Sequence, residues 1–246
     1  MTTGAILFAL GVFFVAGIVR GMVGLGLPTI TLAATSLVLP LSDMIALISL
    51  PTIVTNIWQA MVGGKFTKIL RRQWPLMLPL MITLYGTVWL VGRTAPQWAF
   101  LVLAAVLVIY SGLGLLRIRL RIHPDLEKPL APVIGVVSGV VAGLVGVPIV
   151  PLMPYLQGLD VEPVEMVQTL GVVLCATSLV LTASLLLFGV LDGPHAIVSA
   201  IAVVPAVAGQ HLGTLVRLRL SIDQFRLAIF WALLLTGLYT FASRLL

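Results

Sequence analysis

The chain has 246 residues, of which 60% are hydrophobic and only 9% are charged, and its mean hydropathy is +1.19. A soluble domain carries about 25% charged residues, so this composition excludes a water-soluble fold and indicates an integral membrane protein. The formal charge of +6 comes from cations in short loops between hydrophobic runs. Such cations set membrane topology, and they do not indicate a nucleic-acid-binding protein. The single cysteine, Cys175, excludes an intrachain disulfide and a cysteine metal site.

Eight hydrophobic runs follow one another along the chain, and most have the length of one spanning helix, about 20 residues. The runs cover residues 5–39, 44–62, 74–91, 98–116, 130–159, 166–190, 197–216 and 225–241. The first and the fifth run are too long for one straight helix. Each contains a glycine- and proline-rich break, RGMVGLGLP at 20–28 and GLVGVPIVP at 143–151, where we expect the helix to unwind. The sequence therefore predicts an all-α polytopic membrane protein.

The two breaks belong to an internal repeat with an offset of 122 residues. The sequence GMVG at 21–24 recurs as GLVG at 143–146, and Asn56 corresponds to Ser178 without a gap. We predict two transmembrane repeats, residues 1–122 and 123–246, within one integrated membrane domain. Interrupted hydrophobic segments at matching positions of two halves indicate a transport site.

Two topologies are compatible with the long runs. If each long run crosses once, the chain has eight crossings, with nine Lys and Arg residues on one side of the membrane and four on the other. If each long run enters and returns as a hairpin, each repeat is a broken hairpin plus three transmembrane helices. Eleven Lys and Arg residues then lie on one side of the membrane and two on the other. The second distribution obeys the positive-inside rule better, and three crossings per repeat would make the repeats inverted. We favour the hairpins and keep the eight-crossing alternative open.

The breaks are the first candidate substrate site, because backbone N–H groups at the start of a half-helix suit an anion. The backbone candidates are Gly21, Gly24, Gly26, Gly143, Gly146 and Val147. Close packing of helices through small residues is the alternative interpretation of these glycines. Arg20 adjoins the first break, where it would supply positive charge to an anion, reach the interface or pair with a carboxylate.

Polar side chains inside the hydrophobic runs form a second group of candidates. They are either neutral donors for substrate oxygens or hydrogen bonds between helices. The group comprises Thr55, Asn56, Gln59, Gln168, Thr177 and Ser178. His211 is a candidate proton relay, with a neutral interfacial role as the alternative. Asp192 and His195 flank a Gly-Pro turn, and we expect them in a loop.

Enzyme signatures are missing from the sequence. It contains neither HExxH nor GxSxG, and three scattered histidines do not make a metal site. We therefore predict a protein that is not an enzyme and that holds no cofactor and no metal. The expected partners are a small anion and the lipid bilayer, without nucleic acid, and a homodimer is a further option.

Two glycine-rich stretches, GIVRGMVGLGLP at 17–28 and GVVAGLVGVPIVP at 139–151, each open a half that continues with three helices. In these stretches, and in segment order and length over nearly the whole chain, the sequence resembles the sulfite exporter TauE/SafE family. The resemblance implies a transporter of the bacterial inner membrane for small sulfur anions such as sulfite and sulfonates. Where that family often has a glycine doublet, this chain has Gly24-Leu25-Gly26 and Gly146-Val147-Pro148. We predict export of such an anion by alternating access, with an anion channel or a non-transporting membrane subunit as alternatives.

Overall fold

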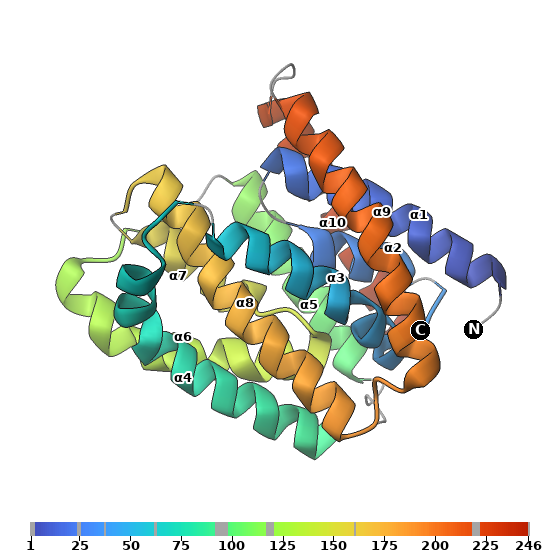
Figure 1. Ribbon diagram of the computed structural model, residues 1–246, viewed down its shortest axis with the longest axis horizontal. Coiled ribbons are helices and arrows are strands. Elements are labelled where there is room, and N and C mark those ends of the chain that lie inside the picture. Colours follow the sequence, from blue (N-terminus) through green and yellow to red (C-terminus); the bar gives the residue numbers. More distant parts are fainter. Residues whose placement is uncertain are drawn as a thin grey trace. The chain divides into compact units, whose positions relative to one another are not determined.

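The computed structural model describes residues 3–23, 26–36, 38–61, 63–91, 98–116, 121–159, 161–217 and 222–245 (Figure 1). Within these ranges the chain forms ten helices and no strand, and six of the helices are long and apolar enough to cross a membrane. The helices are α1 (Thr3–Val23), α2 (Leu27–Thr35), α3 (Leu41–Met61), α4 (Phe66–Val91), α5 (Trp98–Leu115), α6 (Pro124–Val145), α7 (Ile149–Gly158), α8 (Pro163–Leu187), α9 (Gly193–Arg217) and α10 (Ile222–Leu245). The prediction of an all-α polytopic membrane protein is confirmed.

The order of helices repeats along the chain as the sequence does. A long helix, a short helix and three long helices occur once as α1 to α5 and again as α6 to α10. The short helices α2 and α7 begin at Leu27 and Ile149, 122 residues apart, and so do α3 and α8, at Leu41 and Pro163. The starts of these two helix pairs therefore follow the offset of the sequence repeat, while the division at residue 122 stays a prediction.

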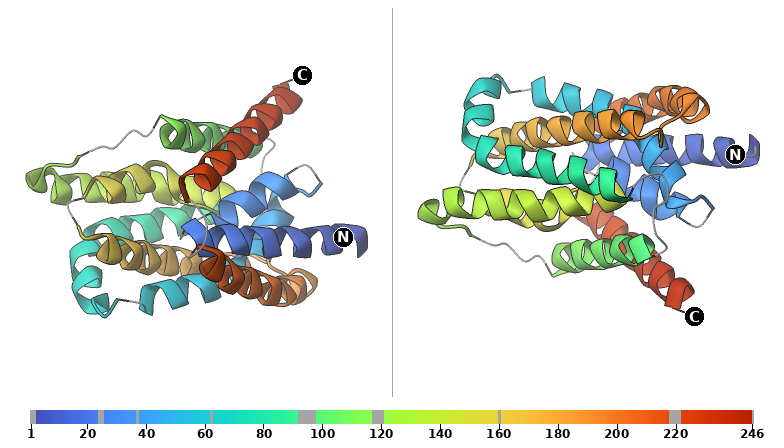
Figure 2. Two further views of the ribbon diagram at one scale, coloured as in Figure 1. Left: turned by 90° about the horizontal axis from the view of Figure 1, so that it is seen from above. Right: turned by 90° about the horizontal axis from the view of Figure 1, so that it is seen from below.

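The compact units of the fold are interleaved along the sequence. Unit 1 comprises Met1–Pro51, Thr94–Arg117 and Val190–Leu246, and unit 2 comprises Thr52–Arg93 and Ile118–Gly189. Within unit 1, α1 packs along α9, and within unit 2, α6 packs along α4 (Figure 2). In both units the first helix of one repeat therefore packs on the fourth helix of the other repeat.

Glycines allow the helix backbones in each of these two pairs to approach closely. A Cβ atom at Gly17 or Gly21 of α1 would overlap the backbone of α9 at Ala206 or Gln210. At the equivalent positions of α6, a Cβ at Gly139 would overlap the Leu80 carbonyl of α4, and one at Gly143 would meet Thr87. Small residues allow helix backbones to approach closely in a membrane. Packing is therefore the structural role of Gly21 and Gly143, as the alternative interpretation proposed.

The second long hydrophobic run enters and returns at one end of unit 2. The Ile122 N–H, before α6, donates to the Gly158 carbonyl at the end of α7 over 2.9 Å. Likewise the Tyr155 hydroxyl of α7 donates to the Glu127 carbonyl near the start of α6, also over 2.9 Å. These contacts bring the two ends of the second long run together, as a hairpin would, while the number of membrane crossings stays a prediction.

A proline interrupts the backbone hydrogen bonds of α3, and a side chain of α9 supplies the missing donor. Pro51 has no N–H, so the Leu47 carbonyl four residues earlier loses its helical donor. The buried hydroxyl of Ser199 in α9 donates to that carbonyl over 2.9 Å and accepts the Leu50 N–H over 3.2 Å. A neighbouring hydroxyl is one way in which a membrane protein satisfies backbone groups freed by proline.

Ser199→Ala is expected to lower the free energy of unfolding by about 1–2 kcal/mol, because it leaves the buried Leu47 carbonyl without its donor. Pro51→Ala restores an N–H for the Leu47 carbonyl, so the same Ser199→Ala change should cost much less in a Pro51→Ala background. Thermal unfolding of the four proteins in detergent measures this double-mutant cycle. Equal costs in both backgrounds would contradict the assigned role of Ser199.

Candidate functional site

The first break lies between the end of α1 at Val23 and the start of α2 at Leu27, in unit 1. Gly26 caps α2 with φ +107° and ψ −8°, a left-handed conformation that favours glycine. Arg20 lies in the last turn of α1 and is buried, with 3% of its surface exposed. Gly24, one of the backbone candidates, lies outside the described residues.

The second break lies in unit 2 and has a different shape. Gly146 ends α6 with φ +82°, and its N–H donates to the Ala142 carbonyl over 2.8 Å. The chain after it is buried, and Val150 is non-helical, with φ −113° and ψ +125°. Among the described residues nothing accepts the N–H of the buried Val147. The second break is therefore a buried, partly extended segment rather than a regular helix start.

The amide side chains of the second candidate group join α3 to α8 within unit 2. Asn56 Nδ2 donates to the Leu174 carbonyl over 3.0 Å and to Ser178 Oγ over 3.3 Å. Gln59 Nε2 donates to the Val167 carbonyl over 3.0 Å. Because residue numbers rise along α3 while those of the partners fall along α8, the second half of α3 runs antiparallel to α8.

Gln168 holds the turn between α3 and α4. Its Nε2 donates to the Ala60 carbonyl and its Oε1 accepts the Lys65 N–H, each over 3.0 Å. Gly63, with φ +116°, lies so close that a Cβ there would sit 2.6 Å from Oε1. The contacts of Gln168 thus fix a turn of the backbone.

The remaining polar candidates bond within their own helices or face outward. Thr55 donates to the Thr52 carbonyl, Thr177 to the Val173 carbonyl and Ser178 to the Cys175 carbonyl. His211 is exposed on α9. Unit 2 contains Gln59, Gln168, the second break and the hydrogen-bonded pair Asn56 and Ser178. Arg20, Gly26 and His211 belong to unit 1. Their roles in substrate binding and proton relay stay predictions.

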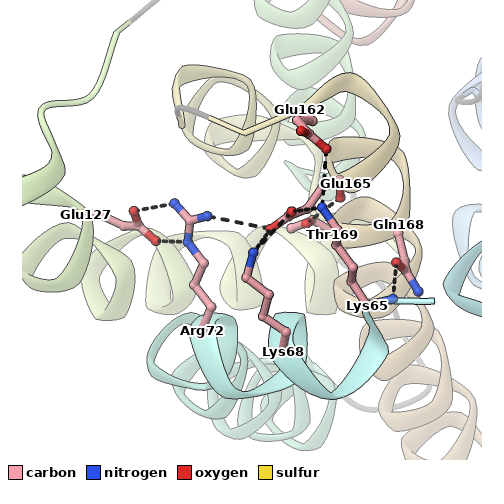
Figure 3. Close-up of polar contacts among 8 residues, drawn as sticks. All are labelled: Lys65, Lys68, Arg72, Glu127, Glu162, Glu165, Gln168 and Thr169. Carbon is pink, nitrogen blue, oxygen red and sulfur yellow. Dashed lines mark hydrogen bonds and ion pairs between the residues drawn. The ribbon is translucent and has the colours of Figure 1, made fainter. Parts of the chain in front are cut away.

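A network of ion pairs at one end of unit 2 was not predicted from the sequence (Figure 3). Its centre is Glu165 in the first turn of α8, with 6% of its side chain exposed. The Glu165 carboxylate lies 2.8 Å from Lys65 Nζ, 3.2 Å from Lys68 Nζ and 3.9 Å from Arg72 Nη1. The hydrogen bond from Lys65 to Glu165 raises the pKa of the Lys65 ammonium. Lys68 and Arg72 belong to α4, which begins at Phe66, so most of the segment between the hydrophobic runs 44–62 and 74–91, expected as a short loop, is helix.

The same network reaches α6 and the loop before α8. Arg72 binds Glu127 of α6 with two hydrogen bonds, of 2.6 and 2.8 Å, and Lys65 also reaches Glu162 over 3.3 Å. Because the residues before α4 and before α8 are in contact, they lie at the same end of unit 2. The hairpin topology places the residues before α4 and before α8 on one side of the membrane. That shared side was the only hint in the sequence that their charged residues could form ion pairs.

Unit 1 has a smaller cluster at the position that the repeat makes equivalent. Asp43, in the first turn of α3, corresponds to Glu165 at the offset of 122 residues. His195 Nε2 lies 3.5 Å from the Asp43 carboxylate, and its Nδ1 lies 2.6 Å from Asp192. His195 is the third residue of α9, as Lys68 is of α4, so the expectation that it lies in a loop is wrong. Within the described part of the chain no group of such residues could hold a metal ion.

The paired breaks, the repeated helix order and the packing of each first helix on a fourth helix extend over almost the whole chain. The sequence profile of the sulfite exporter TauE/SafE family matches residues 9–240. The chain belongs to the sulfite exporter TauE/SafE family. This TauE/SafE protein is therefore a multi-pass membrane transporter of sulfite or related anions, which agrees with the expectation of a protein that is not an enzyme. No curated protein and no solved structure matches the chain.

Proposed function

We propose that this TauE/SafE protein exports a small sulfur anion, sulfite or a sulfonate, across the bacterial inner membrane by alternating access. The observation that carries the proposal is the occurrence of a break at equivalent positions in both repeats, between α1 and α2 and between α6 and α7. Discontinuous helices in matching positions are the usual place of the substrate in secondary transporters. Arg20, Gly26 and Val147 are the proposed ligands nearest the breaks.

We further propose that the two repeats are inverted. The second half of α3 and its equivalent α8 run antiparallel, as inverted copies of one helix would. Asn56 and Ser178 are equivalent at the offset of 122 residues, and they are hydrogen-bonded to each other over 3.3 Å. Contacts between equivalent residues occur where a two-fold axis passes, because each copy then presents the same surface to the other. This pair supports a local two-fold axis between α3 and α8.

Alternating access in this fold would move compact units rather than sequence halves. The units are interleaved, and the boundary between them falls inside α3, between Pro51 and Thr52. Proline interruptions are frequent causes of helix bending. We therefore propose the Pro51 region of α3 as a hinge between the moving bodies.

The membrane potential alone can drive export. Moving one elementary charge is worth about 2.3 kcal/mol per 100 mV. Since about 1.4 kcal/mol corresponds to a tenfold concentration ratio, an interior-negative potential of that size expels a monoanion roughly fortyfold. An exporter of this class needs no coupling ion, so the proposal requires no buried acidic residue.

Reconstitution tests the proposed function. Purified protein in liposomes is expected to move sulfite or methanesulfonate faster than empty vesicles, with a rate that saturates and that responds to an imposed potential. Single-channel currents without saturation would favour the anion channel instead. Flux no faster than in empty vesicles, for every anion in the panel, would overturn the transporter proposal and favour a non-transporting subunit.

A further inference from the structure

We propose that the N-terminus of α2 is the anion subsite of this transporter, and that Thr29 is a substrate-binding residue there. The inference rests on the proposed function and names a site within it. Its ligand is a small oxyanion with several unprotonated oxygens on one centre, such as sulfite or a sulfonate. Thr29 would donate its hydroxyl proton to one of those oxygens.

The backbone at the start of α2 offers donors in a buried position. Gly26 caps the helix without a side-chain bond, and Pro28 has no N–H, so Leu27 and Thr29 supply the N–H groups of the first turn. The Leu27 and Thr29 residues have no exposed surface, and among the described residues nothing accepts their N–H groups. The first N–H groups of any helix lack an intrahelical partner, and here they are also shielded from water. Such a helix start attracts an anion.

The Thr29 hydroxyl is the second, independent observation. It is buried and has no hydrogen-bond partner in the described part of the chain. The other two threonines of α2 differ, because Thr31 donates to the Leu27 carbonyl over 2.8 Å and Thr35 to the Thr31 carbonyl over 2.6 Å. Side chains of a helix tilt toward its N-terminus, so the Thr29 side chain, in the first turn, leans toward the helix end that carries these N–H groups. A buried hydroxyl without a partner costs free energy unless a ligand satisfies it.

The equivalent segment of the second repeat cannot form this subsite. At the offset of 122 residues, Gly26 corresponds to Pro148 and Thr29 to Pro151. Both prolines lack an N–H, and Pro151 has no hydroxyl. In addition, α7 is interrupted at Val150, so it has no regular first turn. The two breaks are therefore chemically different: the first has a regular helix start and a threonine hydroxyl, whereas the second offers the Val147 N–H without either.

A buried cation lies on the neighbouring helix of unit 1. A Cβ at Gly26 would lie 3.6 Å from the Val19 side chain, so the start of α2 packs against the last turns of α1. Arg20 is the next residue of α1 and is buried. A guanidinium buried in the last turns of α1, against which the start of α2 packs, would favour a negatively charged ligand there.

The test compares Thr29→Val, which removes the hydroxyl at nearly constant volume, with Thr29→Ser, which keeps it. Thr31→Val is the matched control, because it removes a hydroxyl of α2 that already has an intrahelical partner. Sulfite, methanesulfonate and acetate are the probes, with affinity measured by thermal shift in detergent and KM by flux into liposomes. We expect Thr29→Val to weaken sulfite binding and raise KM about tenfold or more, the loss of one hydrogen bond to a charged group. Thr29→Ser and Thr31→Val should stay near wild type.

A second readout separates ligand binding from a structural role. Without anion, Thr29→Val should melt at the same temperature as wild type or higher, since it removes an unsatisfied buried hydroxyl. If wild type transports sulfite and Thr29→Val keeps the wild-type affinity and KM, the subsite is wrong while the proposed function stands. A loss of affinity in Thr31→Val as large as in Thr29→Val also overturns it. If wild type neither binds nor moves any probe, the proposed function fails, and the subsite fails with it.

Discussion

Gly21→Ala is expected to lower the free energy of unfolding by about 2 kcal/mol or more, the upper part of the range for overpacked sites. The added Cβ would overlap the Gln210 carbonyl of α9 and lie 2.7 Å from the Thr214 nitrogen. Both are backbone atoms, so no side chain can rotate away, and α1 must move off α9. Close packing at small residues is a main source of the free energy of helix association in a membrane, where the hydrophobic effect contributes little. Thermal unfolding in detergent measures the loss.

The matched control is Gly11→Ala in the same helix. Nothing lies within 4 Å of a Cβ at Gly11, and the position is exposed. Alanine is a better helix former than glycine by about 1 kcal/mol, so this change should leave stability equal or slightly higher. The same substitution in one helix is thus expected to act with opposite sign at the two positions. If Gly21→Ala melts at the same temperature as Gly11→Ala, the α1–α9 contact is not the one described.

The sequence was sufficient to predict the helical membrane class, the duplicated helix order and the places where two helices break. These features depend on local properties, namely hydrophobic run length, glycine and proline content, and a repeat without gaps. The charge count favours the hairpins, and the bond between Ile122 and Gly158 is compatible with one of them. Family membership follows from the same features, since the profile matches residues 9–240.

What could not be predicted depends on which helices become neighbours. Periodicity shows which face of a helix is apolar, but it does not show that α1 packs on α9 or α6 on α4. For the same reason the sequence could not decide between ligand and packing roles for Gly21. It also gave no sign that the Thr29 hydroxyl lacks the intrahelical bond that Thr31 makes, because both are threonines in one apolar run. Partners distant in sequence decide these properties.

Glu165→Gln is expected to destabilise unit 2 by about 2 kcal/mol, because it removes the only charge from a mostly buried side chain that contacts three cations. Lys65 and Lys68 would lose a carboxylate at 2.8 and 3.2 Å, and Arg72 one at 3.9 Å. Glutamine keeps the volume and one acceptor oxygen, so the difference reports charge rather than packing. Because the network joins the start of α4 to the start of α8, the change should also loosen the turn that Gln168 holds.

Glu162→Gln is the matched control at the same end of the unit. Glu162 contacts Lys65 over 3.3 Å, but 76% of its side chain is exposed, and exposed ion pairs contribute little. We therefore expect no measurable change in melting temperature for Glu162→Gln and a clear decrease for Glu165→Gln. High salt should reduce the difference only partly, since screening acts less on buried pairs than on exposed ones. Equal melting temperatures for the two variants would show that the network contributes nothing to the stability of this end, and that burial of Glu165 has no energetic consequence.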